Sequence, residues 1–120
     1  MESLSEAIAA YRAALDAAVQ PDAALAAPQV VNILQARDRL ARLLARCEPP
    51  ANDLAAIAAL DQRLQDSARL LDHSAGRAAF SSWRTALQPP PSAWWWRLDE
   101  RAAEAERPSP VWTVVAVFFL

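Results

Sequence analysis

Apolar residues recur every three or four positions through most of the first 88 residues of the chain, and prolines interrupt this spacing. Such a spacing places apolar side chains along one face of an α-helix. Alanine, leucine and arginine dominate the composition and all favour helix, whereas glycine occurs once, at Gly76. Prolines end one helix or begin the next, because they lack the amide that a helix interior needs. We therefore predict an all-α fold.

The first two predicted helices have recognisable ends. Ser3 and Glu6 have the spacing of a capping box, and the helix that follows is expected to run to about Gln20. The second helix begins near Pro28, because proline is accommodated in a first helical turn, where an amide would have no partner. It ends before the pair at 49–50, and its polar face is rich in arginine.

A third, long helix is expected from the cap at Asn52 or Asp53 to about Leu71. Gly76 is the one residue able to adopt a left-handed conformation without strain, so we place a helix end or kink there. A shorter helix follows, and its apolar stripe consists of Phe80, Trp83 and Leu87.

These segments predict that residues 1–88 form an up-and-down bundle of three long helices plus one short helix. Short connections marked by proline favour antiparallel neighbours, which is the basis of this topology. Two charged residues interrupt the apolar stripes, Arg37 in the second helix and Asp61 in the third. We predict that they pair and fix the register of the two helices.

Ala7, Tyr11, Ala14 and Leu15, followed by Pro21, resemble the second helix of a tetratricopeptide repeat. The likeness covers one helix. No preceding helix carries the Trp-Leu-Gly pattern of that repeat, and no second copy follows at a period of about 34 residues. A repeat fold is therefore not expected.

The composition changes after the bundle. Consecutive prolines make residues 89–92 a stiff spacer. Residues 93–107 are expected to form a helix that begins with three tryptophans and is too polar beyond Leu98 to bury itself. Residues 108–120 end in an uncharged run, Val111–Leu120. Ten helical residues rise about 15 Å, whereas a bilayer core is about 30 Å thick, so we interpret 108–120 as the beginning of a truncated transmembrane helix.

Tryptophan and arginine flank this predicted membrane segment. Tryptophan concentrates at the membrane–water boundary, and arginine near a span favours the cytoplasmic side. The predicted membrane-interface residues are Trp94, Trp95, Trp96, Arg97, Arg101, Arg107 and Trp112. The predicted membrane-embedded residues are Val111, Val114, Val115, Val117, Phe118, Phe119 and Leu120. The N-terminus is acidic, unlike a secretory signal, so the bundle is placed in the cytoplasm and the protein at the membrane.

Other interpretations of the C-terminal third stay open. Val111–Leu120 also has the β-branched and aromatic content of a buried strand, although no second strand is predicted to pair with it. It could instead dock as a tail into a groove of the bundle. The three adjacent tryptophans could be core residues or a protein-interaction patch.

No catalytic site, cofactor or metal is predicted. Asp72, His73 and Ser74 are adjacent and point about 100° apart on a helix, so they cannot align as a hydrolytic triad, and His73 is expected to be solvated. Cys47 continues the apolar stripe of the second helix, so we expect it in the core. One cysteine and one histidine do not make a structural zinc site, and a single glycine does not make a phosphate-binding loop.

Nucleic-acid binding is not expected either. The net charge is −2, and twelve basic residues are interleaved with fourteen acidic ones, so no uniformly basic face is predicted. All twelve basic residues are arginine, a bias that we attribute to GC-rich bacterial coding.

The leading hypothesis is a non-catalytic, cytosolic interaction or sensory module at the N-terminus of a bacterial membrane protein. Its partners would be the lipid bilayer and an unidentified protein. The alternative is a soluble helical adaptor that binds a protein through its Trp-rich C-terminal segment. A third hypothesis, ranked last, is an enzyme fragment whose catalytic part lies downstream.

Overall fold

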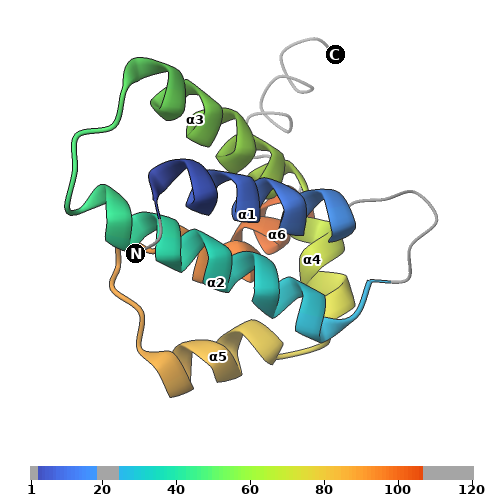
Figure 1. Cartoon of the computed structure of the whole chain (residues 1–120). Coiled ribbons are helices and arrows are strands. Elements are labelled where there is room, and N and C mark those ends of the chain that lie inside the picture. Colours follow the sequence, from blue (N-terminus) through green and yellow to red (C-terminus); the bar gives the residue numbers. More distant parts are fainter. Residues whose placement is uncertain (1–2, 19–24, 107–120) are drawn as a thin grey trace, which may run out of the picture.

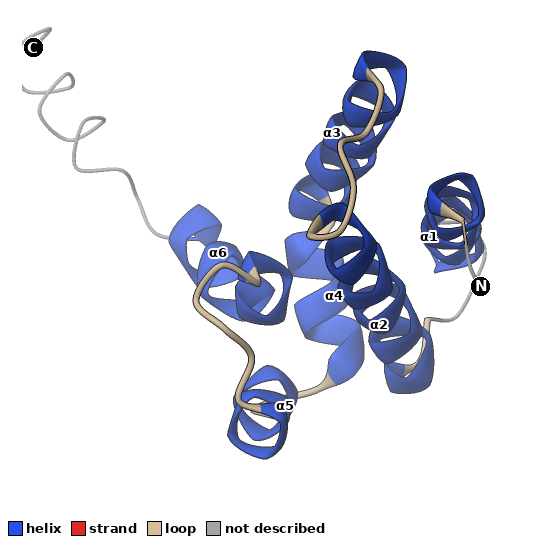
Figure 2. Cartoon of the chain, turned by 60° about the vertical axis from the view of Figure 1, so that its left-hand side comes forward, coloured by secondary structure: helices blue, strands red, loops and turns tan. Residues whose placement is uncertain are grey.

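The computed structural model describes residues 3–18 and 25–106 (Figure 1). Within these ranges all regular secondary structure is helical, and Figure 2 shows helices joined by loops without a strand. The prediction of an all-α fold is confirmed. The helices are α1 (Leu4–Ala18), α2 (Ala27–Leu44), α3 (Ala51–Asp66), α4 (Ala68–Ala75), α5 (Ala79–Leu87) and α6 (Leu98–Glu106), with a 3₁₀ helix, η1 (Trp94–Arg97), before α6.

The helices form a bundle around α2. Helix α1 lies beside α2 and runs in the opposite direction, and α3 contacts the other side of α1 (Figure 1). Helix α4 contacts α2 and α6, while α5 contacts α4 and η1. None of the described helices is long and apolar enough to cross a bilayer.

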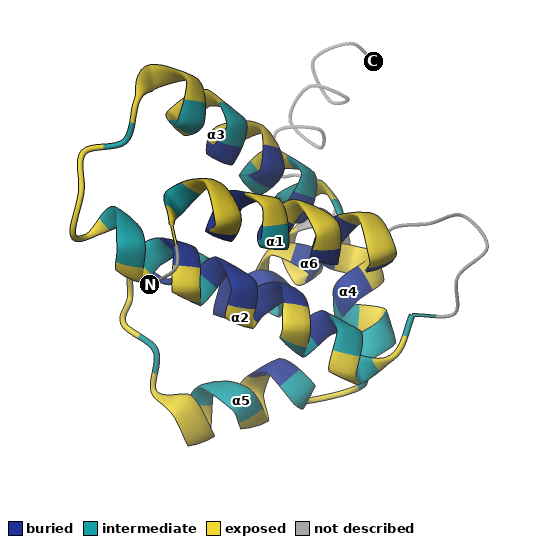
Figure 3. Ribbon diagram, in the orientation of Figure 1, coloured by how far each residue is buried: buried dark blue, intermediate teal, exposed yellow. Residues whose placement is uncertain are grey.

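One buried core draws on all of these helices, with buried faces turned toward the centre of the bundle (Figure 3). The sequence predicts that the bundle ends at residue 88, whereas the core extends beyond the proline spacer. The core residues in this last part are Ala93, Trp95, Trp96, Leu98 and Ala102. Residues 93–104 are thus the final layer of the bundle, because their apolar side chains cover α2 and α4.

Several predicted helix ends are confirmed. The Glu6 amide donates to Ser3 Oγ at 3.1 Å and the Ser3 amide donates to Glu6 Oε2 at 3.4 Å, which is the predicted capping box. Gly76 follows α4 with φ of 101°, a backbone conformation that strains other residues. The predicted end of the first helix at Gln20 lies outside the described residues.

The third helix differs from its prediction. It begins at Ala51, with Pro50 in the cap position, and it breaks at Ser67 where one continuous helix to Leu71 is expected. The Ser67 hydroxyl donates to the Arg63 carbonyl at 2.9 Å, four residues earlier. Such a bond competes with the helical ladder and bends helices, which explains the turn into α4.

Two leucines that continue the apolar stripes of their helices are exposed and lie outside the core. Leu54 near the start of α3 and Leu87 at the end of α5 are 51% and 56% exposed. Both lie where their helices extend past their neighbours, a property that periodicity does not report.

Arg37 and Asp61 form the predicted ion pair. Arg37 Nε lies 2.9 Å from Asp61 Oδ1, and Arg37 Nη2 donates to Oδ2 at 3.1 Å. The Tyr11 hydroxyl donates to the same Oδ1 at 2.8 Å. One carboxylate therefore connects α1, α2 and α3, and its charge is compensated by Arg37, a residue that is only 8% exposed.

The environment of Tyr11 raises the pKa of its phenol. Burial of the ring is the main cause, and the adjacent negative charge of Asp61 adds to it. Both effects disfavour the phenolate, so the folded protein retains this proton at pH values where an exposed tyrosine loses it.

The raised pKa predicts that the protein loses stability above pH 10. In that range the unfolded chain releases the phenolic proton and the folded chain keeps it, so the free energy of unfolding falls by about 1.4 kcal/mol per pH unit. Tyr11 is the single tyrosine and the chain has no lysine, so few other groups titrate there. Urea unfolding at pH 9, 10 and 11 measures the slope, and Tyr11→Phe should abolish it. Appearance of tyrosinate absorbance near pH 10 without unfolding would contradict this account.

Candidate interaction site

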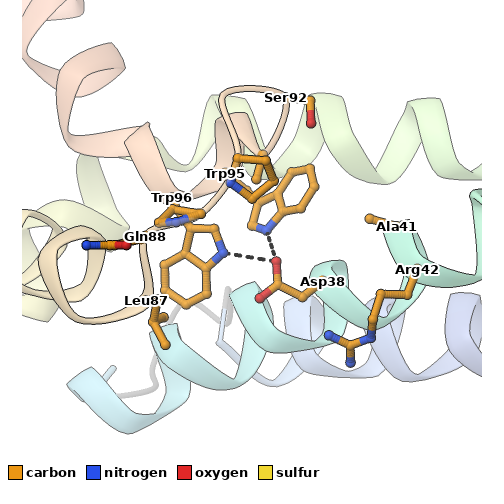
Figure 4. A pocket seen from close by; sticks show the side chains of 11 residues that line it. Asp38, Ala41, Arg42, Leu87, Gln88, Ser92, Trp95 and Trp96 are labelled. Atoms are coloured by element: carbon orange, nitrogen blue, oxygen red, sulfur yellow. Dashed lines mark hydrogen bonds between the residues drawn. The ribbon is translucent and has the colours of Figure 1, made fainter.

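Both indoles of the last bundle layer donate to one carboxylate oxygen. Trp95 Nε1 and Trp96 Nε1 lie 2.7 Å and 2.9 Å from Asp38 Oδ1, as the dashed lines in Figure 4 show. Asp38 is half-buried on α2, and the two tryptophans are 4% and 1% exposed. Hydrogen bonds to a charged acceptor are stronger than neutral ones, so this contact fixes η1 on α2.

Arg37, the neighbour of Asp38, contacts the faces of the tryptophans. Its guanidinium carbon lies 4.3 Å from the ring centroid of Trp95 and 5.9 Å from that of Trp94. Arg37 Nη1 is buried and has no hydrogen-bond partner among the described residues. The cation–π contact supplies the attraction that a hydrogen bond would otherwise provide, and it joins the Asp61 ion pair to the Trp-rich segment.

A second set of contacts fixes α5 and α6. Trp83 of α5 lies edge-to-face between Phe80 and Trp96, with ring centroids 5.1 Å and 6.2 Å away. Arg84 donates to both oxygens of Asp99 at 2.6 Å and 3.0 Å, and also to the carbonyl of Trp96 at 2.9 Å. The hydrogen bonds to Asp99 raise the pKa of Arg84, so this connection stays charged.

A groove lies between α2 and the segment from Leu87 to Trp96. One part of it has a volume of about 320 Å³, and its wall consists mainly of apolar side chains and prolines (Figure 4). A second part, of about 360 Å³, shares Asp38, Arg42, Leu87 and Trp96 with the first and adds Gln35 and Arg39. We call both parts together the α2 groove. The residues specific to its first part are Ala41, Gln88, Pro89, Pro90, Ser92, Ala93 and Trp95.

The backbone at the mouth of the groove is strained. Gln88 has φ of 47° and ψ of 58°, the left-handed conformation that favours glycine. It ends α5 and turns the chain into the prolines. Pro89 and Pro90 line the groove together with Asp38, Ala41 and Arg42 of α2.

The predicted interface residues have different positions in the structure. Trp94 is half-buried, while Arg97 and Arg101 are exposed. Arg97 Nη1 lies 3.4 Å from Glu100 Oε1. Trp95 and Trp96, which the sequence predicts at a membrane surface, are buried in the bundle instead. Asp38 satisfies their N–H groups inside the protein, so they need no aqueous boundary. The predicted residues Arg107, Val111, Trp112, Val114, Val115, Val117, Phe118, Phe119 and Leu120 lie outside the described residues.

The sequence also predicted the exposure of His73 and the burial of Cys47. The first prediction is confirmed and the second is wrong. His73 is exposed in the last turn of α4, as expected. Cys47 is exposed rather than buried, because α2 ends at Leu44 and the apolar stripe stops with it. The role of Asp38 as a hydrogen-bond acceptor was not predicted, because an acidic residue between two arginines is typical of a solvated helix face.

Comparison of the chain with models of protein families, with curated proteins and with solved structures finds no match. The residues that line the α2 groove are therefore the basis for treating it as a candidate site. Its accessible surface combines the exposed side chain of Leu87, a stiff proline edge and charged side chains at its rim, which are features of a candidate binding surface.

Replacement of Asp38 should destabilise the protein more than replacement of an exposed carboxylate. Asp38→Ala removes the acceptor of two buried indole N–H groups, and hydrogen bonds to a charged group contribute about 1.5–3 kcal/mol each. We expect the free energy of unfolding in urea to fall by about 2–4 kcal/mol, and Asp38→Asn, which keeps one acceptor oxygen, to lose less. The control Glu104→Ala changes an exposed carboxylate on α6, and its effect should stay within about 0.5 kcal/mol. Equal losses for Asp38→Ala and Glu104→Ala would refute the anchoring role.

Proposed function

We propose that this chain is a non-catalytic, cytosolic helical interaction module of a bacterial membrane protein, followed by a membrane segment that begins in residues 108–120. The module would bind a protein partner and be held beside the bilayer. Two features support this proposal: the apolar C-terminal sequence, and the contacts that attach the preceding residues to the bundle.

The observation that carries the proposal is the rigid attachment of residues 93–104 to the core. Asp38 and Arg37 hold the tryptophans on α2, and the Arg84–Asp99 pair links α6 to α5. A partner that displaces α2 would therefore also displace Asp38 and the helix that leads toward residue 108. Such a linkage suits a module that transmits binding to the segment that follows it.

The engagement of the buried and half-buried polar side chains supports a non-catalytic role. Asp61, Tyr11 and Arg37 are engaged with one another, and Asp38 is engaged with two indoles. These groups are used to join helices, because each connects two or more elements of the bundle.

The C-terminal part of the sequence supports membrane attachment. Val111–Leu120 contains no charge, and arginines 97, 101 and 107 precede it, which favours a cytoplasmic bundle. Trp94 and Trp112 are the tryptophans that we propose for the interface, since Trp95 and Trp96 are core residues.

A soluble adaptor is the second candidate function. The α2 groove supports it, because the exposed side chain of Leu87 at its edge is an apolar surface that does not depend on lipid. In this case the apolar C-terminal segment would fold against the bundle or a partner instead of entering a bilayer.

Flotation with liposomes separates the two functions. The full chain should float with vesicles of phosphatidylcholine and phosphatidylglycerol, and the variant carrying Val115→Asp and Phe118→Asp should stay at the bottom. The reason is that each carboxylate at the centre of a membrane helix costs roughly 3 kcal/mol. Residues 1–107, which contain all of the described core, should also stay at the bottom.

Circular dichroism is the control, because all three proteins should show the helical spectrum of the folded bundle. A full chain that remains soluble, monomeric and separate from the vesicles would overturn the membrane assignment and favour the adaptor.

A further inference from the structure

We propose that α5 is a detachable segment, which opens away from the bundle by backbone rotation at Ala78 and Gln88 and is held closed by the Arg84–Asp99 pair. Opening would release the hydrogen bonds that Arg84 makes to α6 and to η1. The consequence for the residues that follow α6 rests on the proposed function, whereas the opening itself does not.

Both ends of α5 have a strained backbone. Ala78, which precedes the helix, has φ of 65°, and Gln88, which follows it, has φ of 47°. Among the residues that the structure describes, these are the two non-glycine residues with positive φ. In this region the Cβ atom lies too close to the following carbonyl oxygen, so rotation of the backbone lowers the energy of each residue. The strain therefore opposes the closed position of α5 at the two points where the helix joins the chain.

Little apolar burial holds α5 in place. Phe80 is its single buried residue, whereas α2 has six. Figures 1 and 2 both show α5 at the edge of the bundle, and Leu87 in its last turn is 56% exposed. Hydrophobic stabilisation is roughly proportional to the apolar area buried. We therefore expect α5 to open at a lower free energy than the central helix does.

The polar contacts of one residue oppose this opening. Arg84 donates to the two oxygens of Asp99 at 2.6 Å and 3.0 Å and to the Trp96 carbonyl at 2.9 Å. Two parallel hydrogen bonds between a guanidinium and a carboxylate are stronger than neutral ones. Arg84 is the single charged residue of α5, so the ionic attachment of this helix to α6 depends on one side chain.

Opening of α5 would weaken the attachment of α6 and leave the rest of the core in place. Asp99 lies in the first turn of α6 and would lose its partner. Leu98 and Ala102 would remain in the core. Trp96 would keep its hydrogen bond to Asp38. The opened protein is thus a second state in which the helix before the proposed membrane segment is held less firmly.

Hydrogen exchange of the backbone amides, followed by NMR on the full chain in detergent micelles, tests the inference. Rates are measured at several urea concentrations below the unfolding transition and are corrected for the intrinsic rate of each amide. The amides of α5 should exchange at least about tenfold faster than those of α2 and depend little on urea, because a local opening exposes little surface. The amides of α6 should exchange at a rate between the two.

One variant distinguishes local opening from global unfolding. Ile8 is a core residue of α1, a helix that packs on α2 and α3. Ile8→Val should speed the exchange of α2 by about threefold or more, because it destabilises the core relative to the unfolded chain. The exchange of α5 should not change, since α1 stays packed when α5 opens. An equal acceleration of α2 and α5 would show that α5 opens only with the whole protein, and would overturn the inference.

One substitution made at two positions tests the strain. Ala78→Gly relieves the positive φ and should slow the exchange of α5 by about threefold. Ala86→Gly makes the same change at an exposed position inside α5, where it should speed the exchange by about threefold or more because glycine is a poor helix former. Acceleration by both variants would show that rotation at Ala78 does not accompany opening.

A second pair of variants tests the ionic contact. Arg84→Gln should speed the exchange of α5 by about tenfold or more, as expected for hydrogen bonds to a charged group. Arg77→Gln removes the same charge from an exposed residue before α5 and should have little effect. Equal effects of these variants would remove Arg84 from the inference. Liposome flotation of the full chain tests the membrane assignment independently, so either proposal can fail without the other.

Discussion

The carboxylate of Asp38 connects the last layer of the bundle to its central helix. Two indole N–H groups donate to one of its oxygens, and the tryptophans that carry them, Trp95 and Trp96, are 4% and 1% exposed. An indole N–H left without a partner in a core costs free energy, so the burial of Trp95 and Trp96 depends on this acceptor. Leu98 and Ala102 follow the tryptophans into the core, and α6 is positioned as a consequence.

Arg37 extends the same connection to the rest of the bundle. Residues 37 and 38 are adjacent on α2 and both contact Trp95, Arg37 through the face of the ring and Asp38 through the indole N–H. Arg37 pairs with Asp61, which also accepts the Tyr11 hydroxyl, while its guanidinium lies over the face of Trp95. Three helices and the Trp-rich segment therefore meet at one short stretch of α2. The α2 groove borders this stretch, since Asp38 lines both of its parts.

The sequence predicted the features that depend on local spacing. The capping box at Ser3, the positive φ at Gly76 and the Arg37–Asp61 pair follow from residue type and helical period. The position of the tryptophans did not follow, because an indole suits a membrane boundary and a core equally well and the choice depends on an acceptor 57 residues away. The groove could not be predicted from the sequence either, because its lining comes from α2 and from the segment from Leu87 to Trp96, which are far apart along the chain. The break at Ser67 depends on a side-chain hydrogen bond that competes with the helix, a choice that periodicity does not report.

Hydrogen exchange of the indole N–H groups, followed by NMR in the full chain, tests the central role of Asp38 most directly. Each of the five indole signals can be assigned with a single Trp→Phe variant. The Trp95 and Trp96 signals should exchange far more slowly than that of Trp94, which is half-buried, because their exchange requires the core to open. Rapid exchange of Trp95 and Trp96, at the rate of an exposed indole, would show that the segment lies at a surface and would contradict this account of the fold.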